Sequence, residues 1–330
     1  MNHRTRLESC LSGGRIDRPP VALWRHFPVD DQSPGSLAAA ALDFQASYDF
    51  DLVKVTPASS FCVKDWGIDD EWRGATEGTR DYTIRAIQQV DDWQNLPVLD
   101  PREGYLGRQL ECLKLIVNEL GAEVPVLQTI FNPLSQAKNL VGKEKLLVHL
   151  RQDPGAVHAG LRIIAESTCR FIEAAIQTGI SGLFYAVQHA QYGLMSIGEY
   201  NEFGRPYDLE ILKTASGLWL NMLHLHGEDV MFNLVVDYPV SVINWHDRDT
   251  APSLYEGKRY FSGTVCGGLQ RERIMVLGTP AQVISEAQDA FLATEGKGFI
   301  LGTGCVVPIT APRANILAAR QSVELMPPFS

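Results

Sequence analysis

The chain has 330 residues, of which 45% are hydrophobic, so it is long enough for one large α/β barrel with a sizeable core. Its 29 Lys and Arg against 39 Asp and Glu give a net charge of −10. That charge argues against a nucleic-acid-binding surface, and it makes a polyanionic substrate awkward unless the site itself is basic. No run of eighteen apolar residues predicts a membrane span, and no apolar signal core follows Met1, so we expect a cytoplasmic protein.

Short apolar segments rich in β-formers alternate with long amphipathic segments. The predicted strands, in chain order, are Pro20–Phe27, Asp51–Pro57, Val124–Phe131, Gly182–Gln188, Asn221–Gly227, Ser241–Asp247, Tyr260–Cys266 and Phe299–Cys305. The predicted helices are Leu37–Tyr48, Tyr105–Leu120, Leu161–Ala175, Ile197–Leu220, Pro280–Thr294 and Pro312–Leu325. Eight strands that alternate with helices predict a closed (β/α)8 TIM barrel. An open doubly wound sheet is the alternative, but no G-x-G-x-x-G follows a strand.

The stretch from Ala58 to Glu123 is longer than one crossover needs. We expect an insertion after the second strand, with a hairpin that covers the barrel mouth. No linker or internal repeat is visible, so residues 1–330 are expected to form one domain.

The first chemical motif is Leu223-His224-Leu225-His226-Gly227 at the end of the fifth strand. Residues two apart in a strand point the same way, so His224 and His226 face together and form half of a transition-metal site. A pair of hydrogen-bonded structural histidines is the alternative.

The second motif is Leu301-Gly302-Thr303-Gly304-Cys305 at the end of the eighth strand. Both strand ends open on the same face of a barrel, so the Cys305 thiolate would complete a His2Cys set for Zn²⁺ with an open fourth position. An inert buried thiol is the alternative for Cys305.

Other polar residues end the neighbouring strands and are expected at the substrate. Asn244 and His246 share one side of the sixth strand, Gln188 ends the fourth, and Arg25 ends the first. Lys54 is a weaker candidate.

A fourth metal ligand is also considered. Cys266, at the end of the seventh strand, is the candidate, although a catalytic site requires an open position.

Several of these segments together resemble the uroporphyrinogen decarboxylase superfamily, which includes that decarboxylase and corrinoid-dependent methyltransferases. The segments that carry the resemblance are 18–25, 48–54, 196–207, 223–227, 240–247 and 301–312. The decarboxylase branch usually has two arginines four apart after its first strand, but here Arg25 is followed by Val29. Its second strand normally brings an Asp, where this chain reads Thr56-Pro57-Ala58-Ser59.

The methyltransferase branch fits better. Its members have an H-x-C on strand five and a Cys at the end of strand eight that bind zinc, and His224 and Cys305 match these positions, with His226 in place of Cys. The resemblance implies a zinc-dependent methyltransferase that moves a methyl group between a corrinoid (cobalamin) protein and a thiol or methoxy substrate. The alternatives are a decarboxylase of tetrapyrrole metabolism and a barrel that has lost its chemistry. A homodimer is left open.

Overall fold

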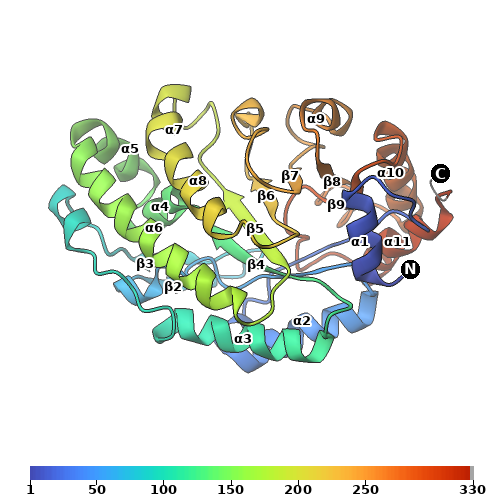
Figure 1. Cartoon of the computed structure of the whole chain (residues 1–330), viewed down its shortest axis with the longest axis horizontal. Coiled ribbons are helices and arrows are strands. Elements are labelled where there is room, and N and C mark those ends of the chain that lie inside the picture. The colour runs from blue at the N-terminus through green and yellow to red at the C-terminus, as the bar shows by residue number, and fades with distance from the viewer. Residues whose placement is uncertain (328–330) are drawn as a thin grey trace.

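The computed structural model describes residues 1–327, and its centre is a strongly curled parallel sheet of the TIM-barrel type (Figure 1). Within these residues the sheet has seven strands in the order β1-β4-β5-β6-β7-β8-β9. Their bounds are β1 Val53–Val55, β4 Val126–Phe131, β5 Gly182–Val187, β6 Met222–Leu225, β7 Val242–Trp245, β8 Thr264–Leu269 and β9 Phe299–Thr303. All seven strands are buried along their whole length, as expected of a parallel sheet covered by helices.

The predicted strand Pro20–Phe27 is reduced to a single bridge. Val21 pairs in parallel with Leu301 of β9, and its carbonyl accepts a hydrogen bond from Asp51 N, just before β1. Pro20 has no N–H to donate, and the N–H of Val21 donates to the Asp51 carboxylate at 2.8 Å instead of to a strand. A regular ladder therefore does not form, but the segment still lies between the two edges of the sheet.

The seventh predicted strand was placed too early. Tyr260 belongs to helix α9 (Leu254–Tyr260), and β8 begins only at Thr264. Ser253 and Glu256 form a capping box, each side chain bonding the other's backbone, and this starts a helix that extends to Tyr260, the first residue of the predicted strand.

The helices pack around the outside of the sheet (Figure 1). The helices that lie within predicted helical segments are α2 Pro34–Tyr48, α3 Gly104–Leu120, α6 Pro154–Ile176, α7 Ile197–Phe203, α8 Arg205–Thr214, α10 Pro280–Ala293 and α11 Arg313–Ser322. The predicted single helix Ile197–Leu220 is two helices. The break lies at Gly204, because Pro206 cannot donate the backbone hydrogen bond that a continuous helix needs there.

Several helices are not predicted by the sequence pattern. They are α1 His3–Leu11, α4 Pro133–Val141, α5 Lys143–Gln152, α9 and the 3-10 turns Asp30–Gln32, Lys64–Trp66, Val90–Asn95, Phe232–Leu234 and Val323–Leu325. Helix α4 is buried on nearly every side, so it lacks the polar face that marks an amphipathic helix.

The insertion after the second predicted strand contains the expected hairpin. Strands β2 (Asp69–Glu71) and β3 (Asp81–Ile84) pair antiparallel, apart from the main sheet. The hairpin lies at the carboxyl ends of β1 and β4, where its residues form part of a cavity wall. None of the helices in residues 1–327 is both long and apolar enough to span a bilayer.

Candidate metal centre

The two histidines of the H-x-H motif lie together at the end of β6. His224 is 3% exposed and stacks on Phe184 of β5 with ring centroids 5.1 Å apart. His226 follows the strand, and its backbone N–H donates a hydrogen bond to the Val187 carbonyl at 2.9 Å. The two imidazole centroids are 5.7 Å apart, as the alternation of side chains along a strand predicts.

Strand β7 adds a third histidine and fixes the orientation of the first. Asn244 pairs in register with His224, and its Oδ1 lies 2.7 Å from His224 Nδ1. Both Asn244 N–H groups donate to carbonyls, of Cys266 at 2.9 Å and Thr303 at 3.0 Å. Asn244 Oδ1 is thus an acceptor, so His224 carries its proton on Nδ1 and directs a free Nε2 lone pair to the centre. His246, two residues on, lies 5.1 Å from the His226 ring centroid.

Cys305 comes from the segment after β9. Its Sγ is 3.6 Å from His226 Nδ1. A Cβ on Gly304 would lie 2.6 Å from His246 Cα, so only glycine lets this segment pass so close to the β7 loop. The ligand atoms of His224, His226, His246 and Cys305 all lie within 4.8 Å of one another. We refer to these four residues as the His/Cys cluster.

The electrostatics of the His/Cys cluster favour a thiolate. Burial alone would raise the pKa of Cys305, but the three surrounding imidazoles outweigh it and hold the pKa well below its usual range. Burial lowers the pKa of His224. His246 is buried too, which would lower its pKa, but the neighbouring Cys305 thiolate raises it.

The donor set fits a transition metal. It has three imidazoles and one thiolate and contains no carboxylate, a combination that suits zinc and not magnesium or calcium. His246 Nε2 is buried and has no hydrogen-bond partner within residues 1–327. Such an unpaired buried nitrogen costs free energy, and a metal ion at the centre of the cluster would satisfy it.

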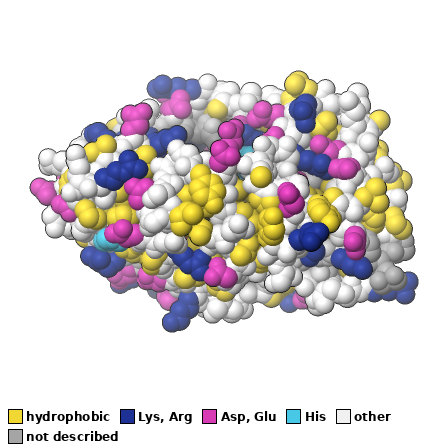
Figure 2. Space-filling view, turned by 90° about the horizontal axis from the view of Figure 1, so that it is seen from above, with side chains coloured by type: hydrophobic (Ala, Val, Ile, Leu, Met, Phe, Trp, Pro, Cys, Tyr) yellow, Lys and Arg dark blue, Asp and Glu magenta, His cyan; other side chains and the backbone are white. Residues whose placement is uncertain are grey.

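Three of the four cluster residues also form the wall of a cavity of about 340 Å³. The cavity opens at the carboxyl ends of the strands, on the face that Figure 2 shows to be hollowed and bordered by charged side chains. Its other walls include the aromatic residues Trp24, Tyr82, Phe131 and Phe184 and the cations Lys54, Arg80, Arg85, Lys138 and Lys143. A barrel enzyme of this type carries its active site at this end.

Lys54 is the cation most closely tied to the His/Cys cluster. Its Nζ lies 4.6 Å above the Phe184 ring, which in turn stacks on His224, and it contacts Thr56 Oγ1 at 3.2 Å. Burial lowers the pKa of Lys54 to about 7, an effect that the Cys305 thiolate partly offsets. Lys54 is only a weak candidate in the sequence analysis, because the position of a lysine at a strand end does not reveal that its side chain is buried.

The other predicted residues divide into those at the cavity and those away from it. Gln188 lies on the cavity wall and accepts a hydrogen bond from Lys138 Nζ at 3.0 Å. Arg25 does not lie on the cavity wall, although its neighbours Trp24 and His26 do. The Arg25 guanidinium lies 5.2 Å from the centroids of both the Phe27 and the Phe44 ring. The alternation of side chains in an extended segment accounts for the difference.

Asn244 and Cys266 both lie away from the cavity wall. Asn244 is fully buried behind His224, to which it is hydrogen-bonded, and it is not part of the cavity wall. Cys266 lies outside the His/Cys cluster found in residues 1–327, and burial raises the pKa of its thiol. Conversely, the cavity wall includes three cations that the sequence analysis did not single out, namely Arg85, Lys138 and Lys143. Arg85 lies in the irregular insertion and the two lysines lie in helices, where residue spacing does not indicate a site.

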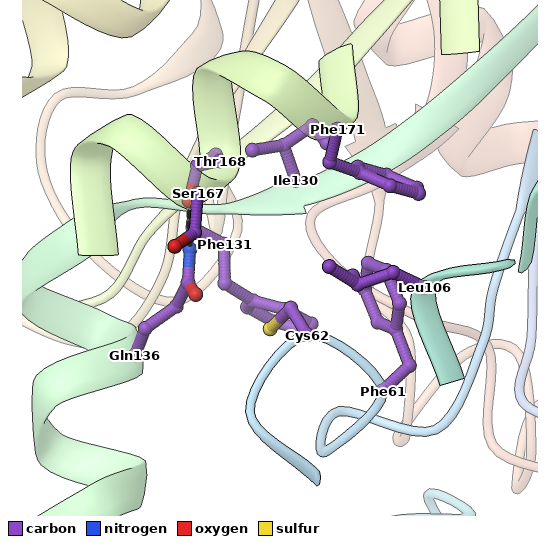
Figure 3. Close-up of a pocket in the computed structure, with 9 residues that line it drawn as sticks. All are labelled: Phe61, Cys62, Leu106, Ile130, Phe131, Gln136, Ser167, Thr168 and Phe171. Atoms are coloured by element: carbon purple, nitrogen blue, oxygen red, sulfur yellow. Dashed lines mark hydrogen bonds between the residues drawn. The ribbon is translucent and has the colours of Figure 1, made fainter. Parts of the chain in front are cut away.

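A second, much smaller hollow of about 10 Å³ has Phe131 as a wall residue in common with the large cavity (Figure 3). It is lined by Phe61, Cys62, Leu106, Ile130, Phe131, Gln136, Ser167, Thr168 and Phe171. A space of this size holds at most one water molecule, so the large cavity is the candidate substrate site.

The curled parallel sheet, with polar and metal-binding residue types at the carboxyl ends of its strands, defines a TIM-type α/β protein with an enzyme-like site. The family model for uroporphyrinogen decarboxylase (URO-D) matches residues 27–325. The chain belongs to this family.

Relatives in the family carry two kinds of name. The chain is 24% identical over 236 residues to the methylcobamide:CoM methyltransferase MtbA of Methanosarcina acetivorans, covering 70% of this chain and 67% of the relative. It is also 24% identical over 251 residues to the uroporphyrinogen decarboxylase of Rhodococcus opacus, covering 72% and 68%. A solved methyltransferase from Methanosarcina mazei superposes with a TM-score of 0.84 at 19% identity over 97% of this chain and 98% of that one. This likeness shows the fold.

Proposed function

We propose that this protein is a zinc-dependent methyltransferase that moves a methyl group between a corrinoid protein and a thiol or methoxy substrate. The observation that carries the proposal is the His/Cys cluster, whose four ligand atoms lie within 4.8 Å of one another beside the cavity. The names of the methylcobamide:CoM methyltransferase relatives support the same activity and a corrinoid partner.

Zinc would be held by His224, His226 and Cys305, a set that would leave one position open for substrate. His246, which is predicted at the substrate, lies within reach of the same centre as a further donor. Bound zinc would supply a Lewis acid that stabilises the anionic form of a thiol or of a leaving oxygen. The three first-named residues also form part of the cavity wall, whereas His246 does not. Substrate therefore approaches the cluster from the side opposite His246.

The chain's own residues prepare this site in two ways. Asn244 keeps the His224 proton on Nδ1, so that Nε2 is free to bind metal. Aromatic side chains, with Trp24 and Phe184 in edge contact at 5.1 Å, form an apolar part of the cavity wall next to the cluster.

The metal content of the purified protein tests the proposal, with Cys266→Ala as the matched control. Cys266 is a buried cysteine of the neighbouring strand that lies outside the cluster. We expect about one zinc per chain in the wild type and in Cys266→Ala, and loss of zinc in Cys305→Ala and His224→Ala. Stoichiometric zinc retained in Cys305→Ala would contradict the proposal. If zinc binding is as expected, methylation of a thiol by a methylated corrinoid protein is the activity to assay.

A second candidate function is decarboxylation, which one observation favours. The cavity wall is strongly basic, so a substrate that carries carboxylates is not excluded by the acidic net charge of the chain. A decarboxylase would not depend on the His/Cys cluster. Turnover of uroporphyrinogen by chelator-treated protein and by Cys305→Ala would favour decarboxylation over methyl transfer.

A further inference from the structure

Lys54 is a buried lysine without a counterion. Its side chain belongs to the cavity wall, and the residue is only 8% exposed. Within residues 1–327 its Nζ forms one hydrogen bond, to Thr56 Oγ1 at 3.2 Å, and no ion pair with a carboxylate. Lysine is almost never buried in this way unless it is paired, and titratable groups perturbed by burial in a cleft are typical of functional sites.

The hydrogen bonds of Thr56 show how the Lys54 amine is oriented. The Thr56 hydroxyl donates its single proton to the Lys54 carbonyl at 3.3 Å, so its oxygen accepts a hydrogen bond from Lys54 Nζ. This bond uses one N–H of the amine. The lone pair of a neutral Lys54 amine has no partner among the described residues, so it is available to a molecule in the cavity.

Uncharged surroundings keep much of this amine neutral near pH 7. Burial lowers the pKa of Lys54 to about 7, and the Cys305 thiolate only partly offsets this effect. His26 is a further titratable group that interacts with Lys54, and burial lowers the pKa of His26 to about 3, so it carries no charge at neutral pH. The neighbouring strands β4 and β5 present uncharged residues to the cavity, namely Thr129, Phe131, Phe184 and Ala186.

The same position also suits a protonated amine. Lys54 Nζ lies 4.6 Å from the centroid of the Phe184 ring, and the face of an aromatic ring stabilises a cation. Lys54 forms no hydrogen bond with the His/Cys cluster in residues 1–327, but the attraction of the Cys305 thiolate reaches it. The amine can therefore adopt either protonation state close to the proposed metal centre.

A thiol substrate has to lose a proton in this cavity. The thiolate, and not the thiol, is the nucleophile and the metal ligand, and a free alkyl thiol has a pKa of about 8.5. Burial brings the pKa of two lysines of the wall near neutrality, to about 7 for Lys54 and about 8 for Lys138. Lys138 donates to Gln188 Oε1, whereas Lys54 is the lysine that interacts with the cluster through Cys305.

We propose that Lys54 is a catalytic residue that accepts the proton of a thiol substrate at its Nζ. The S–H bond breaks and an N–H bond forms, which gives a thiolate beside the His/Cys cluster and an ammonium group above Phe184. Nothing is oxidised or reduced, and the net charge of the buried cavity stays the same because one anion and one cation form together. The inference rests on the proposed function, since it takes a thiol as the methyl acceptor.

Calorimetry of thiol binding counts the protons and tests the inference. Zinc-loaded protein is titrated with 2-mercaptoethanol in buffers of different ionisation enthalpy, which gives the number of protons released per thiol bound. With a pKa of about 7, about nine-tenths of the Lys54 amine is neutral at pH 8 and about one-tenth at pH 6. We expect the wild type to release about 0.1 proton per thiol at pH 8 and about 0.9 at pH 6.

Three variants assign the proton to Lys54. Lys54→Met has no amine, and Lys54→Arg keeps a positive charge but cannot accept a proton, so each should release about one proton per thiol at both pH values. Lys138→Met is the matched control, because it removes the other lysine of the wall with a lowered pKa and should keep the wild-type counts. Thermal melting verifies that each variant is folded, and its zinc content verifies that the site is loaded.

The outcomes separate failure of the inference from failure of the proposed function. Release of about one proton by the wild type at pH 8 overturns the inference whatever the variants do, while methyl transfer to a thiol stands. Loss of the pH dependence in Lys138→Met but not in the two Lys54 variants overturns it as well. If the zinc-loaded protein binds no thiol, transfer to a thiol fails as the function, and the role of Lys54 fails with it.

Discussion

Asn244 is hydrogen-bonded both to the backbone of the sheet and to a proposed metal ligand, and replacing it with Ala beside a matched control should separate the two effects. The side chain is fully buried and makes three hydrogen bonds, one with His224 Nδ1 and two to the carbonyls of Cys266 and Thr303. In Asn244→Ala the two carbonyls lose a donor, at about 1–3 kcal/mol each, so the free energy of unfolding should fall by roughly 2–6 kcal/mol. His224 would no longer be held in one tautomer, and zinc affinity should drop about 10- to 100-fold.

Asn221→Ala is the matched control for this experiment. Asn221 is 3% exposed, accepts from Leu183 N at 3.0 Å and donates to Ala215 O at 3.0 Å, but it lies outside the His/Cys cluster. Urea unfolding of the metal-free proteins gives stability, and competition with a chelating dye gives zinc affinity. Both variants should be destabilised, and Asn244→Ala alone should lose zinc affinity. Equal zinc affinities in the two variants would refute the positioning role of Asn244.

Two further perturbations test other parts of the site. Because burial lowers the pKa of Lys54 to about 7 from its ordinary 10.5, protonated Lys54 destabilises the fold at low pH, and this cost declines as the pH rises from about 7 to 10.5. Lys54→Met should therefore raise the free energy of unfolding of metal-free protein at pH 6 and have a smaller effect at pH 10; the same gain at both pH values would be inconsistent with a buried, titrating lysine. Gly304→Ala should weaken zinc binding, since its Cβ would lie 2.6 Å from His246 Cα and push Cys305 away, whereas Gly35→Ala, with no atom within 4 Å of its Cβ, should bind zinc like the wild type.

Most of the strands and three of the four residues of the His/Cys cluster could be predicted from the sequence. The period of two placed His224 and His226 on one face, and the Gly-rich end of the last strand placed Cys305 on the same rim. These are local properties of a buried parallel strand, and they persist whatever the neighbouring elements do. The hairpin of the insertion was likewise visible in its local pattern.

The role of each remaining residue depended on which strands became neighbours and which way their side chains turned. His246 joins the cluster because β7 lies in register beside β6, and Arg25 leaves the site because its segment turns Trp24 and His26 inward instead. Three cations of the cavity wall come from separate segments: Arg85 follows β3, Lys138 lies in α4 and Lys143 begins α5. No spacing rule relates such segments. Net charge is a sum over the whole surface, so an acidic chain can enclose a basic cavity, and only the tertiary structure shows where the unpaired charges meet.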